Sequence, residues 1–304
     1  LDYSFAYASK FKGVGLSNWN TAEVTTLAGT FYGAAVFDEN ISSWTTTKVK
    51  NMNLTFATYY GGAHAFNQPI GTWDTSSVTA METTFYSNPN FNQNLKWNTS
   101  LVESMYGMFG YASKFNGELA TNEALGYWGT GSVKDFSTMF ARSSFNQDIS
   151  GWDTSSAEDM SYMFSGVSSF NQDLSKWDVS KVTNMSWMFN CATSFNNGNN
   201  EDLSRWDVSN VTDMSWMFGD AIAFNTDISR FNTSAVTNME GMFFRAVSFN
   251  GNINSWNVLA VTNMSHMFSS SFRFPTVFNS DISSWDTSSV TNMKCMFRDA
   301  ITFN

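Results

Sequence analysis

Apolar and polar positions recur along this chain in a fixed order. In the copy that begins at Trp206, the apolar positions continue with Val211, Met214, Met217 and Phe218, which gives the pattern W-x4-V-x2-M-x2-M-F. A fixed period of this length is typical of a repeat array, and the copies predict about eleven coils. Successive Trp positions are 24, 25, 29 or 31 residues apart and are filled by Trp19, Trp44, Trp73, Trp97, Trp128, Trp152, Trp177, Trp206, Phe231, Trp256 and Trp285.

The spacing inside one unit predicts a short strand followed by a short helix. From Val182 onward, apolar residues follow at i+3, i+6, i+7 and i+10, which is helical spacing that a strand cannot use. Ser180 precedes this run at the place of a helix N-cap. Residues 172–176 read as a short strand or extended arm. A helix of about ten residues is marginal alone, so we expect each unit to fold only against its neighbours.

The invariant apolar positions predict the core. We expect the Trp column to be stacked, one indole on that of the next coil, with each indole N–H bonded to backbone. Phe231 indicates that the column needs an aromatic ring more than it needs the N–H. The predicted core residues include Trp73, Trp152, Trp177, Trp206, Trp256, Trp285, Met185, Phe189, Met214 and Phe218.

Length changes between copies are confined to two places in the repeat. The segments 56–66 and 268–278 are longer than their counterparts, and so are 115–128 and 195–206. Such insertions predict loops on defined edges of the array, with Tyr59, Tyr60 and His64 in one loop. An Asn follows the repeat Phe almost everywhere, as at Asn171. This row predicts an Asn ladder that bonds the backbone of successive coils, with ligand binding as the alternative.

A longer motif, F-N-x-D-I-S-x-W-D-x-S-x-V-T-x-M-S-x-M-F-x-x-A, is matched closely by residues 145–164, 170–189 and 278–297. It resembles the BspA-like surface-protein repeat, and the resemblance covers essentially all 304 residues. That family looks like a divergent branch of leucine-rich repeats. The resemblance therefore implies an α/β, right-handed, leucine-rich-repeat-like solenoid with one short strand and one short helix per coil. It also implies a cell-surface or secreted setting, often for adhesion, and it carries no catalytic residues.

The unbroken period predicts a single solenoid domain over residues 1–304. The piece from Phe5 to Phe11 is the back half of a unit, and Phe297 to Phe303 is the same piece again. No atypical capping unit stands at either end, although repeat arrays need polar caps. We therefore expect this chain to be a fragment that starts and ends in mid-repeat.

Charge and composition narrow the possible partners. The net charge of -10 and the pI near 4.6 argue against nucleic acid or an anionic membrane surface. No apolar run is long enough for a transmembrane segment. Cys191 and Cys295 lie four coils apart, too far for a disulfide. His64 and His266 belong to no nucleophile motif, and no phosphate-loop or metalloprotease signature occurs. The sequence thus predicts a protein that is not an enzyme.

Two rows of carboxylates suggest a possible metal site. One row follows the repeat Phe and includes Asp148 and Asp173, and the other follows the Trp and includes Asp178 and Asp207. Stacked coils would align each row, and calcium suits aligned carboxylate oxygens. The alternative is that each Asp accepts N–H bonds from its own turn. Asn40, Asn94 and Asn252 replace Asp in the first row, which favours turn acceptors and no cofactor.

The tenth residue after the Trp is aromatic in three consecutive units, at Tyr162, Trp187 and Trp216. On a helix this position lies about 150° from the centre of the apolar face, so these rings would face solvent. An exposed row of large aromatic rings makes a patch suited to a sugar or to a protein hot spot. The alternative is an irregular helix whose indoles fold down between coils.

These observations predict a non-enzymatic extracellular or cell-surface adhesion scaffold that presents an extended face to a protein or glycan on another surface. Tyr162, Trp187 and Trp216 are the candidate ligand-binding residues. Two alternatives remain: a structural filament or surface layer assembled end to end, and a calcium-dependent glycan-binding module.

Overall fold

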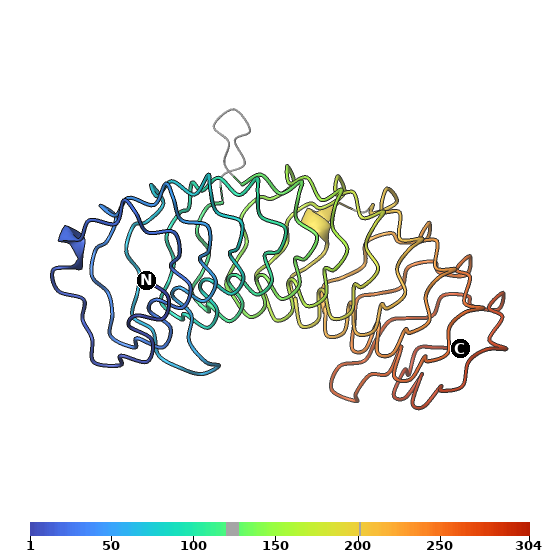
Figure 1. Ribbon diagram of the computed structural model, residues 1–304. Coiled ribbons are helices and arrows are strands. Elements are labelled where there is room, and N and C mark those ends of the chain that lie inside the picture. The colour runs from blue at the N-terminus through green and yellow to red at the C-terminus, as the bar shows by residue number, and fades with distance from the viewer. Residues whose placement is uncertain (120–127, 201) are drawn as a thin grey trace. The chain divides into compact units, whose positions relative to one another are not determined.

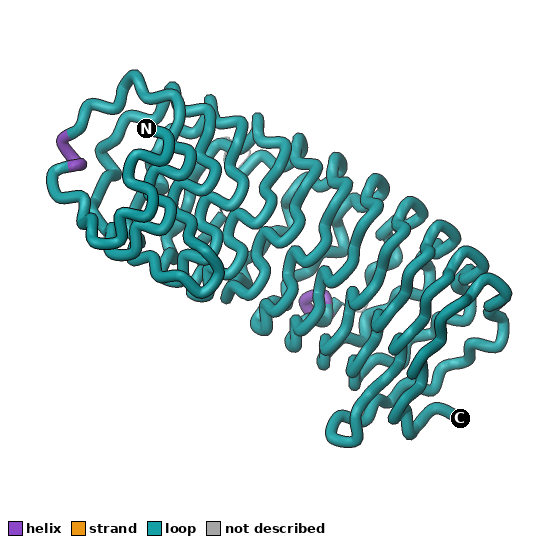
Figure 2. Tube along the Cα trace, turned by 60° about the horizontal axis from the view of Figure 1, so that its bottom comes forward, coloured by secondary structure: helices purple, strands orange, loops and turns teal. Residues whose placement is uncertain are grey.

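The structure is a computed structural model, and it describes residues 1–119, 128–200 and 202–304. The chain divides into two compact units, Leu1–Asp153 and Thr154–Asn304. Within each unit, segments about one repeat apart in sequence lie side by side as successive coils of a stack (Figures 1 and 2). That the whole chain forms a single solenoid domain stays a prediction.

The predicted strand and helix in each coil are wrong. Across the described ranges, the helices are two short 3-10 turns, η1 (Leu16–Asn18) and η3 (Asn197–Asn199), and no strand extends beyond an isolated bridge pair. The tube in Figure 2 is accordingly drawn almost entirely as loops and turns. The α/β leucine-rich-repeat-like architecture is therefore not the fold of this protein.

Consecutive turns replace the predicted helix. The N–H of Met217 donates to the carbonyl of Met214 in the same coil at 3.2 Å, whereas the N–H of Trp216 donates to Glu240 of the next coil at 2.7 Å. This alternation recurs along the segment, so the N–H groups bond in turn within the coil and across to its neighbour. A turn that closes every third residue buries side chains at i, i+3 and i+6. This is the same apolar spacing that indicates a helix.

Two left-handed residues per coil make these turns possible. We call the tenth and fourteenth residues after the repeat Trp position ten and position fourteen. Position ten has positive φ in every coil that begins at a repeat Trp or at Phe231, and position fourteen in most of them, as at Trp216 (φ 56°) and Asp220 (φ 54°). A right-handed helix contains no such residues, so this geometry is incompatible with the predicted helix.

Parallel bridges join most successive coils at the seventh residue after the Trp. In the second unit these bridges link Asp159 to Asn184, Asn184 to Asp213, and Asp213 to Asn238. The side chain at this position accepts the N–H two residues later, as Asp213 does from Ser215 at 2.8 Å. Each bridge residue thus bonds both the next coil and its own turn.

Aromatic columns fill the inside of the coils. In each coil the repeat Phe pairs stack closely, as Phe189 and Phe195 do at 3.8 Å between ring centroids. The rings of the Trp column lie parallel from coil to coil, as Trp206 and Phe231 do at 6.4 Å. The Trp206 indole N–H donates to the carbonyl of Leu174 at 3.0 Å. Of the core residues predicted above, all lie at most 4% exposed except Trp285, which is half-buried.

The Asn ladder is confirmed. The Asn171 side-chain oxygen accepts the N–H of Asn196 at 2.8 Å, and Asn196 in turn accepts that of Asn225 at 2.9 Å. The same bond recurs between further coils, which satisfies backbone donors that no strand or helix pairs.

The longer segments differ in where their side chains lie. In segment 56–66, Tyr59 and Tyr60 are exposed, but His64 is buried beneath the coil. In segment 268–278, a bridge between Ser271 and Phe274 closes a tip that leaves Phe272 92% exposed. The insertion within 115–128 includes residues 120–127, which lie outside the described residues.

Candidate functional site

The structure places Tyr162, Trp187 and Trp216 against one another on the surface of the second unit. The Tyr162 and Trp187 rings stack with centroids 5.5 Å apart and 6° between planes. The Trp187 and Trp216 rings stack at 5.1 Å and 19°. We call these three residues the aromatic row. They belong to three successive coils, so the row follows from the stacking of coils and from one repeated backbone position.

The left-handed backbone at position ten directs these rings. Tyr162, Trp187 and Trp216 have φ of 58°, 61° and 56°, a conformation that costs a residue with a side chain roughly 1–2 kcal/mol. The next coil has Gly241 at this position, and a Cβ there would lie 2.6 Å from the Trp216 ring. The glycine thus leaves room for the Trp216 ring to pack against the next coil.

The aromatic contacts continue beyond the row toward the exposed loop tip. Trp216 contacts Phe244 with centroids 5.1 Å apart and 55° between planes. The Arg245 guanidinium lies 5.8 Å from the Phe244 ring centroid and 4.3 Å from that of Phe274, which is cation–π geometry. We call Tyr162, Trp187, Trp216, Phe244, Arg245 and Phe274 together the aromatic ridge.

Arg245 is anchored from below by a carboxylate. Its Nε lies 3.2 Å from Oδ1 of Asp220, and both side chains are largely covered. Burial raises the pKa of Asp220, and the charge of Arg245 opposes that rise. The ion pair holds the guanidinium against the rings, so the ridge is a fixed surface and its cation is already compensated.

The central ring of the row, Trp187, presents its edge to solvent. Trp187 lies between Tyr162 and Trp216, so a neighbouring ring covers each of its faces. Tyr162 is 40% exposed, and both indoles are half-buried. They therefore neither project freely nor enter the core. The sequence allowed either rings that face solvent or indoles that fold down between coils. The structure shows neither arrangement, because the backbone is left-handed at these positions.

The carboxylates proposed as a possible calcium site serve as turn acceptors. Asp148, Asp173 and Asp178 accept the N–H two residues later at 2.8–2.9 Å, and Asp207 does so at 3.0 Å. The hydroxyl and N–H of Ser180 hold the pKa of Asp178 below its usual range. Within the described ranges, no group of three or more His, Cys, Asp or Glu could hold a metal ion.

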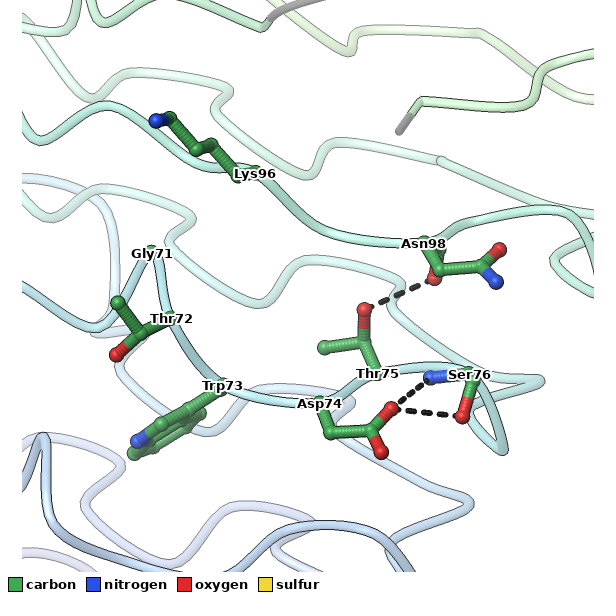
Figure 3. A pocket seen from close by; sticks show the side chains of 8 residues that line it. All are labelled: Gly71, Thr72, Trp73, Asp74, Thr75, Ser76, Lys96 and Asn98. Atoms are coloured by element: carbon green, nitrogen blue, oxygen red, sulfur yellow. Dashed lines mark hydrogen bonds between the residues drawn. The ribbon is translucent and has the colours of Figure 1, made fainter. Parts of the chain in front are cut away.

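The first unit has a hollow of about 550 Å³ that no repeat pattern indicated (Figure 3). Lys96 lies on one side of it, and the stretch Gly71–Ser76 of the preceding coil lies on the other. Asn98 completes the lining. An adjoining hollow of about 360 Å³ shares Gly71, Thr72 and Lys96.

The histidines show no catalytic arrangement. His64 is 1% exposed, with Nε2 3.1 Å from the carbonyl of Phe31 and Nδ1 accepting the N–H of Phe66 at 3.3 Å. Burial lowers its pKa to about 4, so the ring is neutral at pH 7. His266 belongs to the other unit. Separately, no helix in the described part of the chain is long and apolar enough to span a membrane.

Sequence reasoning missed part of this surface. It found the aromatic row but not Phe244, Arg245 and Phe274, which extend it. The signal was present: Phe244 doubles the repeat Phe243, and Phe274 stands in a recognised insertion. The hollow beside Lys96 also had a signal, because Phe91 to Trp97 is one residue shorter than the equivalent segment from Phe170 to Trp177.

Comparison with known proteins gives a family but no function. The family model described as "Mycoplasma protein of unknown function, DUF285" matches residues 1–60, 57–122, 119–201 and 196–304, as repeated copies along the chain. No curated protein and no solved structure matches the chain.

Proposed function

The chain belongs to the DUF285 repeat family, and on that premise we propose that it is a non-enzymatic surface protein that binds another protein through the aromatic ridge. The observation that carries this proposal is a continuous series of contacts on successive coils: ring stacking from Tyr162 to Phe244, and then cation–π contacts through Arg245 to Phe274. The resemblance of the repeat to BspA-like surface proteins supports an extracellular or cell-surface setting and a role in adhesion.

The orientation of the rings favours a protein over a glycan as the ligand. Sugar recognition by aromatic residues uses an open ring face, and both faces of Trp187 are covered by neighbouring rings. Ring edges with an adjacent arginine instead resemble the aromatic and Arg anchors of protein interfaces. The ridge can therefore pack into an apolar groove on a partner without rearranging.

Charge favours a partner with basic residues around that groove. Residues 154–304 contain 8 Lys and Arg against 14 Asp and Glu, and the Arg245 charge is already compensated by Asp220. Complementary charge would speed association and orient the partner. We expect binding to weaken as salt rises.

The test is binding of the purified, labelled chain to an array of extracellular proteins and to a glycan array. The variants are Trp187→Gly with Trp216→Gly, and Leu259→Ser as a matched control. Leu259 is 50% exposed in the same unit but is not part of the ridge. We expect the parent and the control to bind the same proteins, and the double variant to lose roughly tenfold or more in affinity.

Two results would contradict the proposal. One is a folded double variant that binds every target as the parent does. The other is binding confined to glycans. Thermal unfolding of the variants, measured beside the array, separates a lost surface from a lost fold.

A further inference from the structure

We call the segment between the repeat Phe and the following Trp the arm of a coil. The arm from Phe91 to Trp97 is one residue shorter than the others of this type, such as that from Phe170 to Trp177, and a hollow lies beside it. In arms of ordinary length, the N–H of the Trp donates to the carbonyl three residues earlier, as Trp73 does to Ile70 at 3.1 Å and Trp177 to Leu174 at 3.0 Å. In the described residues the Trp97 N–H makes no such bond. The missing residue removes this turn, and we attribute the hollow of about 550 Å³ to its loss.

The backbone of Gly71, which has no side chain, forms part of the wall of the hollow. A Cβ on Gly71 would lie 2.4 Å from the carbonyl oxygen of Asn94, so no side chain fits there without moving the chain. The volume of the hollow falls in the roughly 300–1,000 Å³ range of small-molecule sites. The adjoining hollow across Lys96 gives a longer ligand room to continue.

The polar groups around the hollow combine free donors with a free acceptor. Oδ1 of Asp74 accepts the N–H and hydroxyl of Ser76 at 3.0 and 2.7 Å, which leaves Oδ2 as an acceptor. The side-chain oxygen of Asn98 accepts the N–H and hydroxyl of Ser100 at 3.0 and 2.8 Å, which leaves its NH₂ group as a donor. Lys96 is exposed and has no ion-pair partner among the described residues.

The charges of these groups select the class of ligand. The hydroxyl and N–H of Ser76 hold the pKa of Asp74 below its usual range, so the carboxylate stays ionised and disfavours an anion. The Lys96 ammonium disfavours a cation. A hydroxyl group both donates and accepts a hydrogen bond, so hydroxyl groups on a neutral ligand match the donors as well as the acceptor around the hollow.

We propose that the hollow between Lys96 and residues 71–76 is a binding site for a neutral carbohydrate. Figure 3 shows Lys96 at one end of the hollow and Asp74 and Asn98 at the other. Lys96 and Asn98 can donate to sugar hydroxyls, Asp74 can accept from them, and the hydroxyl of Thr72 can do either. This site lies in the first unit and does not rest on the function proposed for the aromatic ridge in the second unit.

The test uses methyl glycosides of glucose, galactose, mannose and N-acetylglucosamine as probes, followed by NMR chemical-shift titration of the whole chain. We expect saturable shifts at residues 71–76 and 96–98 with at least one sugar. Lys96→Met should weaken that binding roughly tenfold. Lys176→Met is the matched control, because Lys176 has the same place in an arm of ordinary length, and it should bind as the parent does.

A second variant tests the cause of the hollow. Inserting Ser between Leu95 and Lys96 restores the Leu-Ser-Lys-Trp sequence of residues 174–177. We expect this variant to fold at least as stably as the parent and to show no saturable shifts. The proposal is overturned if no probe saturates with the parent, if the insertion variant binds equally well, or if acetate and phosphate bind in place of the neutral sugars.

Discussion

The residues at position ten combine backbone strain with surface stacking. Most proteins place glycine where φ is positive, because a Cβ there clashes with the chain. Gly29, Gly107 and Gly241 follow this rule, whereas Trp187 and Trp216 do not. Strained residues persist when their surroundings hold them, and they gather at binding sites. The two indoles are held by the neighbouring rings. We therefore expect them to contribute most of the binding energy of the proposed ridge.

This strain gives a prediction for Trp216. Trp216→Ala and Trp216→Gly both remove the ring, but only glycine relieves the left-handed backbone. We expect the glycine variant to be more stable than the alanine variant by about 1 kcal/mol in urea unfolding. Ser186, with a negative φ in the neighbouring coil, is the control, and there the order should reverse. Equal stabilities of the two Trp216 variants would argue against a positive φ.

His64 makes the stability of the first unit depend on pH. Its pKa is lowered from 6.5 to about 4 by burial, so the unfolded chain takes up a proton at a higher pH than the folded chain. The stability is fully present above about pH 6.5 and falls as the pH drops toward 4. The loss is on the order of 2 kcal/mol by about pH 5.

The measurement is urea unfolding at several pH values between about pH 7 and pH 5, for the parent and for His64→Gln. Glutamine keeps a donor for the Phe31 carbonyl but does not titrate. We expect the parent to lose stability over this range and the variant to lose much less. A parent curve parallel to that of the variant would mean that His64 is accessible to protons in the folded chain.

At the scale of the element, the sequence located every coil but misidentified its secondary structure. Val211, Met214 and Met217 recur at i, i+3 and i+6, and both a helix and a run of turns bury that series. A run of turns differs from a helix at position ten, where Leu54, Thr83 and Trp216 have positive φ. Side chains of this kind disfavour that conformation, so no local propensity pointed to it. Bonding between coils overrides that local preference.

The candidate site, too, could be predicted only in part from the sequence. The period was enough to bring Tyr162, Trp187 and Trp216 together, because residues at one repeat position stack when coils stack. It could not give the orientation of the rings, which depends on φ. It marked Phe274 as part of a longer segment, but it could not give the contact of Phe274 with Arg245, since that contact depends on how segment 268–278 folds back.

The turns depend on side chains that cap their own backbone. Asp213 accepts the N–H of Ser215 at 2.8 Å, and Asn184 and Asn238 do the same in neighbouring coils. Asp213→Ala should therefore cost about 1 kcal/mol. Asp213→Asn should cost less, because Asn keeps the oxygen that accepts the Ser215 N–H and loses only the oxygen that accepts the Asn238 side-chain amide at 3.3 Å. Thermal unfolding checks the order of the two variants. A greater loss with Asn than with Ala would show that charge, and not the accepted N–H, is what matters there.

At the scale of the whole molecule, bonds between coils replace regular secondary structure. Aromatic columns fill the interior, the Asn ladder follows one edge, and parallel bridges between most successive coils follow another. Each coil in a stack depends on its neighbours, as in other repeat arrays. The same dependence places surface residues in straight rows, so a repeated position becomes an extended surface.

The coils are built from turns with a left-handed residue at position ten. NMR measures this directly, through the intraresidue HN–Hα NOE and the Cα shift at Tyr162, Trp187 and Trp216. We expect positive φ at all three residues, as at the equivalent residues of the other coils. Helical shifts and negative φ throughout 211–218 would contradict it, and the aromatic ridge would then have no backbone to support it.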